Sequence, residues 1–94
     1  MLIKSSGKKG ASALIFKGPC NLIGISFTGD TAQEPTLTVY DNISATGTEV
    51  AFLMVSDETH TINIMFPDRG LFCSTGLYAA ISAETGDYII YYSI

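Results

Sequence analysis

The chain has 94 residues, and a chain of this length forms one domain, which excludes a multidomain organisation. Hydrophobic residues make up 47% and charged residues only 15% of it, with a formal net charge of −4. Its longest apolar runs, residues 50–55 and 88–92, are far shorter than the roughly 20 residues of a membrane-spanning helix, which excludes an integral membrane protein.

Residues 1–10 form a basic segment ahead of the first strand-forming run. All four lysines lie within the first 17 residues, whereas all nine acidic residues lie from Asp30 onward. We predict a basic N-terminal arm over residues 1–10 and a single β-sandwich domain over residues 11–94. Two interpretations stay open for the arm: a flexible, soluble leader, or a segment that docks on an oppositely charged partner. No long apolar run follows it, so we expect no signal peptide and synthesis in a cytoplasm.

From residue 11 onward, runs of β-branched and aromatic residues alternate with Gly, Asn, Asp and Ser, and helical signal is almost absent. In residues 21–28, Ile23, Ile25 and Phe27 occupy one face of a predicted strand and Leu22 the other, as in a half-buried strand. The almost wholly apolar run 49–55 predicts a central strand. The strand candidates in this half are residues 11–17, 21–28, 36–40 and 49–55.

The second half of the chain repeats this pattern of short strands and turns. Pro67, Asp68 and Gly70 make a strong breaker after an alternating run in which Ile62 and Ile64 share one face. The strand candidates here are residues 59–66, 71–73, 77–82 and 88–93. Seven or eight short strands at this spacing predict an all-β fold, either a compact antiparallel β-sandwich or a jelly-roll-like barrel.

The last predicted strand is apolar or aromatic on both faces. Tyr88 and Tyr92 alternate with Tyr91, so the strand is either buried centrally or covered by a neighbouring subunit. The chain also holds more apolar material than a small solvated monomer needs, which predicts burial between subunits. The candidate subunit-interface residues are Tyr88, Tyr91, Tyr92 and Arg69.

No group of residues in the sequence predicts catalysis, a cofactor or a metal site. His60 is the only histidine, and the acidic residues fall in predicted turns without the spacing of a calcium loop. The separation of Cys20 and Cys73 excludes a CxxC pair, and both are expected to be buried free thiols. Nucleic-acid binding is not expected either, because the lysines lack interleaved arginine and aromatic residues. We therefore expect a protein without enzymatic activity.

Five short segments, in a fixed order, carry a resemblance to known proteins. They are residues 18–25 (GPCNLIGI), 37–42 (LTVYDN), 44–48 (SATGT), 76–79 (GLYA) and 88–92 (YIIYY). Together they resemble a group of small virion proteins of tailed bacteriophages that are labelled capsid decoration, cement or head-fibre-like proteins. The resemblance implies a compact β-sandwich that sits on an assembled shell, often as a trimer, and it transfers no functional residue.

The sequence therefore leads us to expect a phage virion structural protein that binds the assembled capsid and decorates or stabilises it. The expected partners are the major capsid protein or another virion component, and further copies of the chain in a homotrimer, without nucleic acid or membrane. The alternatives are a carbohydrate- or receptor-binding module of a viral fibre or tail, and a non-catalytic assembly adaptor. The candidate capsid-contacting residues are Lys4, Lys8 and Lys9.

Overall fold

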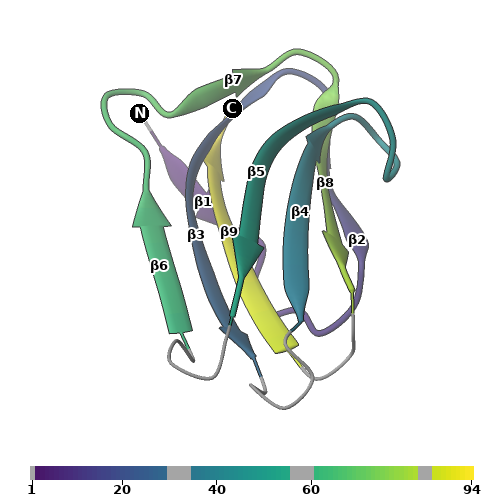
Figure 1. Cartoon of the computed structure of the whole chain (residues 1–94). Helices are drawn as coiled ribbons and strands as arrows, with labels where there is room; N and C mark the ends of the chain where they lie inside the picture. Colours follow the sequence, from purple (N-terminus) through teal and green to yellow (C-terminus); the bar gives the residue numbers. More distant parts are fainter. Residues whose placement is uncertain (1, 30–34, 56–60, 83–85) are drawn as a thin grey trace.

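The computed structural model describes residues 2–29, 35–55, 61–82 and 86–94. Within these residues, nine strands form two antiparallel sheets that pack face to face (Figure 1), so the predicted all-β sandwich is confirmed, with one or two strands more than expected. The strands are β1 (Ile3–Ser5), β2 (Ala13–Lys17), β3 (Cys20–Gly29), β4 (Thr36–Asp41), β5 (Thr48–Met54), β6 (Thr61–Met65), β7 (Leu71–Cys73), β8 (Gly76–Ile81) and β9 (Gly86–Ser93).

Sheet A has five strands and is built around β3, the longest of them. β3 lies between β9 and β6, and β1 extends the sheet beyond β9. The short strand β7 pairs with the first residues of β3 at the end of the sandwich that also holds both chain termini (Figure 1). Sheet B has four strands in the order β2, β8, β4 and β5. The two sheets therefore leave β1 and β6, and β2 and β5, as edge strands of the described structure.

The core lies between the sheets, where the inward-facing apolar residues of both meet. Leu37 and Val39 on β4 are fully buried, and so is Phe27 on β3. Burying a side chain of this size contributes about 1.5–3 kcal/mol, so this layer accounts for most of the stabilisation. The other buried residues of the core cluster are Cys20, Leu22, Ile25, Leu53, Val55, Cys73, Leu77, Ala79, Tyr88 and Ile90.

A β-bulge on β3 corrects the strict alternation expected for residues 21–28. The register with β9 shifts between Leu22 and Gly24, so Leu22 faces the core together with Ile25 instead of opposing it. An inserted residue reverses the side on which the following side chains point, because the pleat repeats every two residues. A Cβ at Gly24 would collide with the Met65 side chain, which lies across this position on the outer side of sheet A.

The prediction of a central strand over residues 49–55 is wrong. Among the described strands β5 pairs only with β4, so it is an edge strand of sheet B. Leu53 and Val55 are buried, whereas Phe52 and Met54, which alternate with them, are exposed. The run is apolar on both sides because its outer side carries exposed apolar residues, which a sequence pattern cannot distinguish from burial.

The separation of residues 1–10 from the domain is also wrong. Ile3–Ser5 form β1, whose residues pair with the last residues of β9. Beyond β1, Lys9 and Tyr88 exchange two backbone hydrogen bonds, at 2.9 and 2.8 Å. The backbone N–H of Ser6 donates a hydrogen bond to the Ile90 carbonyl, and the Ser6 hydroxyl accepts one from the Ile90 N–H. The first residues thus complete the edge of sheet A, because β9 offers unpaired backbone groups there that must be hydrogen bonded.

Tyr88 anchors this N-terminal segment from inside the core. Its side chain is 1% exposed, and its hydroxyl donates a 2.7 Å hydrogen bond to the Ala11 carbonyl. Burial raises the pKa of Tyr88 to about 12, with a smaller contribution from Tyr78. We expect Tyr88→Phe to lower the free energy of unfolding by about 1 kcal/mol, because one buried hydrogen bond is lost. Tyr91→Phe on the outer side of β9 is the control, with an expected change within about 0.5 kcal/mol. Urea unfolding checks both, and equal effects would contradict the anchoring role.

Candidate functional site

The outer side of sheet B carries large apolar side chains that are exposed to solvent. Phe52 and Met54 on β5 are 57% and 53% exposed, and Leu14 on β2 is 43% exposed. The strand register places polar and aromatic residues of β4 and β8 between them. We refer to this set as the apolar face: Leu14, Thr36, Thr38, Tyr40, Phe52, Met54, Tyr78 and Ala80.

The apolar face is poor in charge. Of the described residues on the strands of sheet B, Glu49 and Lys17 bring charges to this side. Glu49 lies opposite Tyr40, in the row next to that of Phe52, and Lys17 lies opposite Gly76 at the end of β2. Thr38 is only 9% exposed although it points outward, because it is flanked in the sheet by Phe52 and Ala80. Depletion of charge and enrichment of aromatic residues and methionine are typical of the centre of a protein–protein interface.

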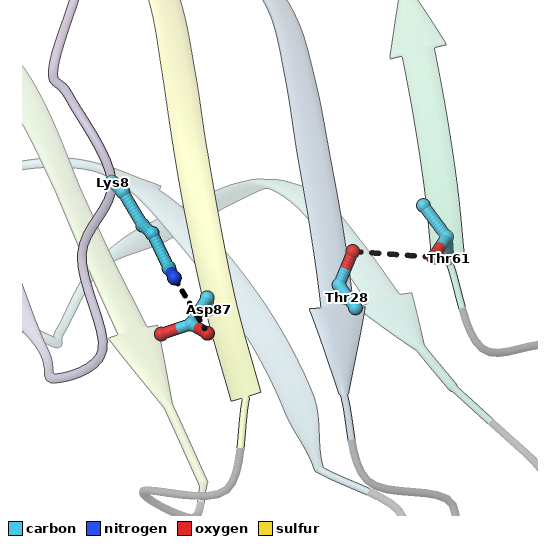
Figure 2. A network of polar contacts seen from close by, with 4 residues as sticks. All are labelled: Lys8, Thr28, Thr61 and Asp87. Atoms are coloured by element: carbon cyan, nitrogen blue, oxygen red, sulfur yellow. Dashed lines mark hydrogen bonds and ion pairs between the residues drawn. The ribbon is translucent and has the colours of Figure 1, made fainter.

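The outer side of sheet A has a different character, with two polar contacts side by side near the ends of its strands (Figure 2). Lys8 Nζ lies 3.6 Å from Asp87 Oδ2, and Thr28 Oγ1 lies 3.2 Å from Thr61 Oγ1. Thr28 and Asp87 are register partners on β3 and β9, which places both contacts in one row. Next to them, the Ser26 hydroxyl donates a 2.7 Å hydrogen bond to an oxygen of the Asn63 side chain.

A hollow of about 230 Å³ opens over this polar row. It is bordered by Lys8, Asp87 and Thr28, with Ile89 supplying apolar surface. A cation, a carboxylate and a hydroxyl around an apolar wall can hold a small polar molecule, but the volume lies below the range of about 300–1,000 Å³ of ordinary small-molecule sites. The Lys8 and Asp87 side chains are 72% and 51% exposed, so solvent and salt screen their charges.

The structure separates the three lysines that we expected to contact a capsid. Lys4 lies exposed on the edge strand β1, Lys8 is paired with Asp87, and Lys9 is half-buried beside β9. All three belong to the same lateral margin of sheet A and are not carried by a free arm. Lys8 belongs to the polar row and Lys9 is half-buried, so Lys4 is the exposed lysine of the three that lies outside the polar row.

The predicted interface tyrosines lie in three different environments. Tyr88 is a core residue, which removes it from the candidate interface and favours the central-burial alternative for this position. Tyr92 is half-buried and packs against Phe16, with ring centroids 5.7 Å apart. Tyr91 points to the outer side of sheet A, where its register partners are Gly24 and Ser5. Among these tyrosines, Tyr91 is therefore the one on the outer side of sheet A, on the other sheet from the apolar face.

Arg69 lies exposed in the turn between β6 and β7. It borders a hollow of about 400 Å³ together with Asn21, Ser93 and Ile94. The positive φ of 58° at Asp68 and of 81° at Gly70 shapes this turn, and Asp tolerates that region better than most residues. Arg69 is thus held at the β7 end of the molecule, far along β3 from the polar row.

Asp41 makes the densest set of polar contacts to one side chain in the described structure. Its carboxylate accepts backbone hydrogen bonds from Thr75 at 2.9 Å, Ser74 at 3.1 Å and Gly76 at 3.3 Å, and one from the Ser74 hydroxyl at 3.4 Å. Burial acts to raise the pKa of this carboxyl, but these hydrogen bonds outweigh it and hold the pKa below its ordinary value. The group is thereby kept ionised, and it joins the end of β4 to the turn between β7 and β8.

Cys20 and Cys73 are both buried and free, so the prediction of buried free thiols is confirmed. Two acidic residues expected in turns, Asp41 and Asp87, lie instead at strand positions on β4 and β9. His60 and the expected turn residues Asp57 and Glu58 lie outside the described residues. Within the described part of the chain, no cluster of three or more His, Cys, Asp or Glu could hold a metal ion, and no helix is long and apolar enough to cross a membrane.

No protein-family model matches the chain, and no curated protein is significantly similar to it. The resemblance to phage capsid decoration proteins therefore stays a prediction from the five short segments.

Sequence reasoning missed both surface features that the fold assembles. The apolar face joins Leu14 to Phe52 and Met54 across four strands, and no local pattern connects positions so far apart. The polar row joins Lys8 to Asp87 in the same way. The one local signal is the almost wholly apolar run 49–55, which does not distinguish an exposed apolar outer side of β5 from a buried strand.

Proposed function

We propose that this protein is a structural protein of a tailed-bacteriophage virion, which binds the assembled capsid and decorates or stabilises it as a homotrimer. The observation that carries the proposal is the apolar face, whose exposed Phe52, Met54 and Leu14 provide a charge-poor surface for association. The compact sandwich fold and the order of the five segments agree with it.

In this proposal one surface associates with other subunits and another binds the capsid. The apolar face lies between neighbouring subunits, where burying it removes apolar area from water. The margin of sheet A that carries Lys4 contacts the major capsid protein on the surface of the particle. Binding energy then favours the assembled shell over its dissociated subunits by mass action, and no chemical step is involved.

Co-sedimentation with assembled shells tests this function. Shells are assembled from the major capsid protein encoded in the same genome, mixed with the purified protein and separated on a density gradient. We expect saturable binding that weakens with salt, and weaker binding for Lys4→Glu than for Lys17→Glu, an exposed lysine on β2 in sheet B. Absence of the wild-type protein from the shell fraction would contradict the proposal, and equal effects of both substitutions would contradict the role of Lys4.

The oligomeric state is a separate prediction, checked by light scattering coupled to size exclusion at micromolar concentration. We expect a trimer for the wild-type protein and a shift toward monomer for Phe52→Ser, with association roughly 30- to 150-fold weaker because a buried phenylalanine contributes about 2–3 kcal/mol. Phe72→Ser is the matched control, since Phe72 is 65% exposed on β7 in the other sheet. A wild-type monomer would contradict the trimer and favour the assembly adaptor.

The polar row supports a carbohydrate- or receptor-binding module as the second candidate. Lys8, Asp87 and Thr28 present charged and hydroxyl groups that can hydrogen bond to a sugar hydroxyl beside Ile89. A glycan array distinguishes the two functions: a defined sugar that binds the wild-type protein and is lost in Asp87→Asn would favour this module over capsid decoration.

A further inference from the structure

The two cysteines lie directly opposite each other in sheet A. Cys20 is the first residue of β3, Cys73 is the last residue of β7, and they are register partners in this antiparallel pair. Opposed residues on antiparallel strands have Cα atoms about 4.5–5.5 Å apart, which falls within the 4.4–6.8 Å range spanned by disulfides. Both side chains point inward, with exposures of 1% and 0%, so their Sγ atoms share one side of the sheet. No large backbone movement is needed to join them.

We propose that Cys20 and Cys73 form a reversible intramolecular disulfide that fastens β7 to β3 when the protein meets an oxidising environment. The inference stands on the register of this pair and is independent of the proposed function. In a virion protein the bond would form after release from the reducing cytoplasm, where thiols are kept reduced.

Access to the thiols requires β7 to open. Burial raises the pKa of Cys20 to about 11, with a smaller contribution from the Asp41 charge, and burial followed by Cys20 and Asp41 raises that of Cys73 to about 12. Almost no thiolate is therefore present in the closed state at neutral pH. β7 is only three residues long, pairs with β3 alone among the described strands, and exposes Leu71 and Phe72. A short strand with a single partner can open locally without global unfolding, at a free energy below that of the whole domain.

A small-molecule disulfide such as oxidised glutathione completes the reaction. The thiolate of one cysteine attacks a sulfur of that molecule, which forms a mixed disulfide and releases one small thiol. The second thiolate then attacks the protein-bound sulfur and releases the other small thiol. In total, the protein loses two protons and two electrons in forming one S–S bond, and the small-molecule disulfide is reduced to two thiols. A reductant reverses each step.

The experiment compares reduced wild-type protein with protein incubated in oxidised glutathione at neutral pH. We expect loss of both titratable thiols in denaturant, a mass decrease of two hydrogens in a single chain, and a rise of roughly 10 °C in the unfolding midpoint, because the bond closes a long loop. Dithiothreitol should restore the original mass and midpoint. The variants Cys20→Ala and Cys73→Ala should show no oxidant-dependent rise.

Three outcomes would overturn the inference. In the first, both thiols stay titratable after an incubation that oxidises the same chain when it is unfolded in urea. In the second, oxidation yields a stable glutathione adduct or a disulfide-linked dimer in place of the intramolecular bond. In the third, the bond forms but lowers the midpoint, which would mean that it distorts the pairing of β3 with β7. All of these readouts use the wild-type protein without shells, so they are separate from the test of capsid binding.

Discussion

Gly70→Ala is expected to lower the free energy of unfolding by about 3 kcal/mol or more. Gly70 follows the turn between β6 and β7 with a φ of 81°, a backbone conformation that costs other residues about 1 kcal/mol. An added Cβ would also collide with the carbonyl oxygen of Leu22, whose carbonyl carbon would lie 2.9 Å away. Leu22 is a core residue on the central strand β3, so its backbone cannot move aside without disturbing the core.

Gly7→Ala is the matched control for this prediction. Gly7 has a φ of 74°, close to that of Gly70, but a Cβ there would meet nothing within 4 Å. We expect a loss of only about 1 kcal/mol, from the backbone conformation alone. Urea unfolding of both variants at one pH separates the two contributions. If both variants lose the same free energy, close packing of Gly70 against Leu22 is not what requires glycine at this position.

The second large effect is expected for Asp41→Asn, with a loss of about 2 kcal/mol at neutral pH. The carboxylate accepts three backbone hydrogen bonds at the turn between β7 and β8, and hydrogen bonds to a charged group contribute about 1.5–3 kcal/mol. An amide retains one oxygen acceptor but turns an NH₂ group toward the backbone N–H groups. Asp87→Asn is the control, because Asp87 forms a surface ion pair with Lys8 whose loss should change stability by less than about 1 kcal/mol.

The pKa of Asp41 adds a dependence on pH to the same prediction. Its pKa in the folded protein is lower than that of an ordinary aspartate side chain, so the folded state favours the ionised form. The stabilisation is fully present above the unfolded-state pKa and is lost as the pH falls through the lower folded-state pKa. Wild-type protein should therefore lose more stability than Asp41→Asn between neutral pH and about pH 3. Parallel pH profiles for the two proteins would contradict the assigned role of the carboxylate.

Most of the fold was predictable because its signals are local. The alternation of Leu37 and Val39 with threonines identifies β4, and Pro67 with Gly70 marks the turn that ends β6. Such patterns depend on neighbouring residues and on the two-residue repeat of a strand. The segment 3–5 was missed because three residues carry too little pattern; β1 forms only because β9 offers it an unpaired edge.

The candidate surfaces were less predictable than the strands. Tyr88 and Tyr91 differ by three positions in an aromatic run, yet one is a core residue and the other faces outward. The sequence pattern describes both sides of β9 as apolar and does not say which side the second sheet covers. Exposure of Phe52 depends in the same way on β5 being an edge strand with an open outer side.

By itself, the sequence determined the fold class, eight of the nine described strands and the segregation of lysines from acids. These properties follow from composition and from contacts between residues close in the chain. Only the tertiary structure decided which strands are edges, which side of each strand is exposed, and that Cys20 lies opposite Cys73 and Lys8 beside Asp87. The physical reason is that strand order and register depend on how distant segments bury their apolar sides together, which short-range patterns do not encode.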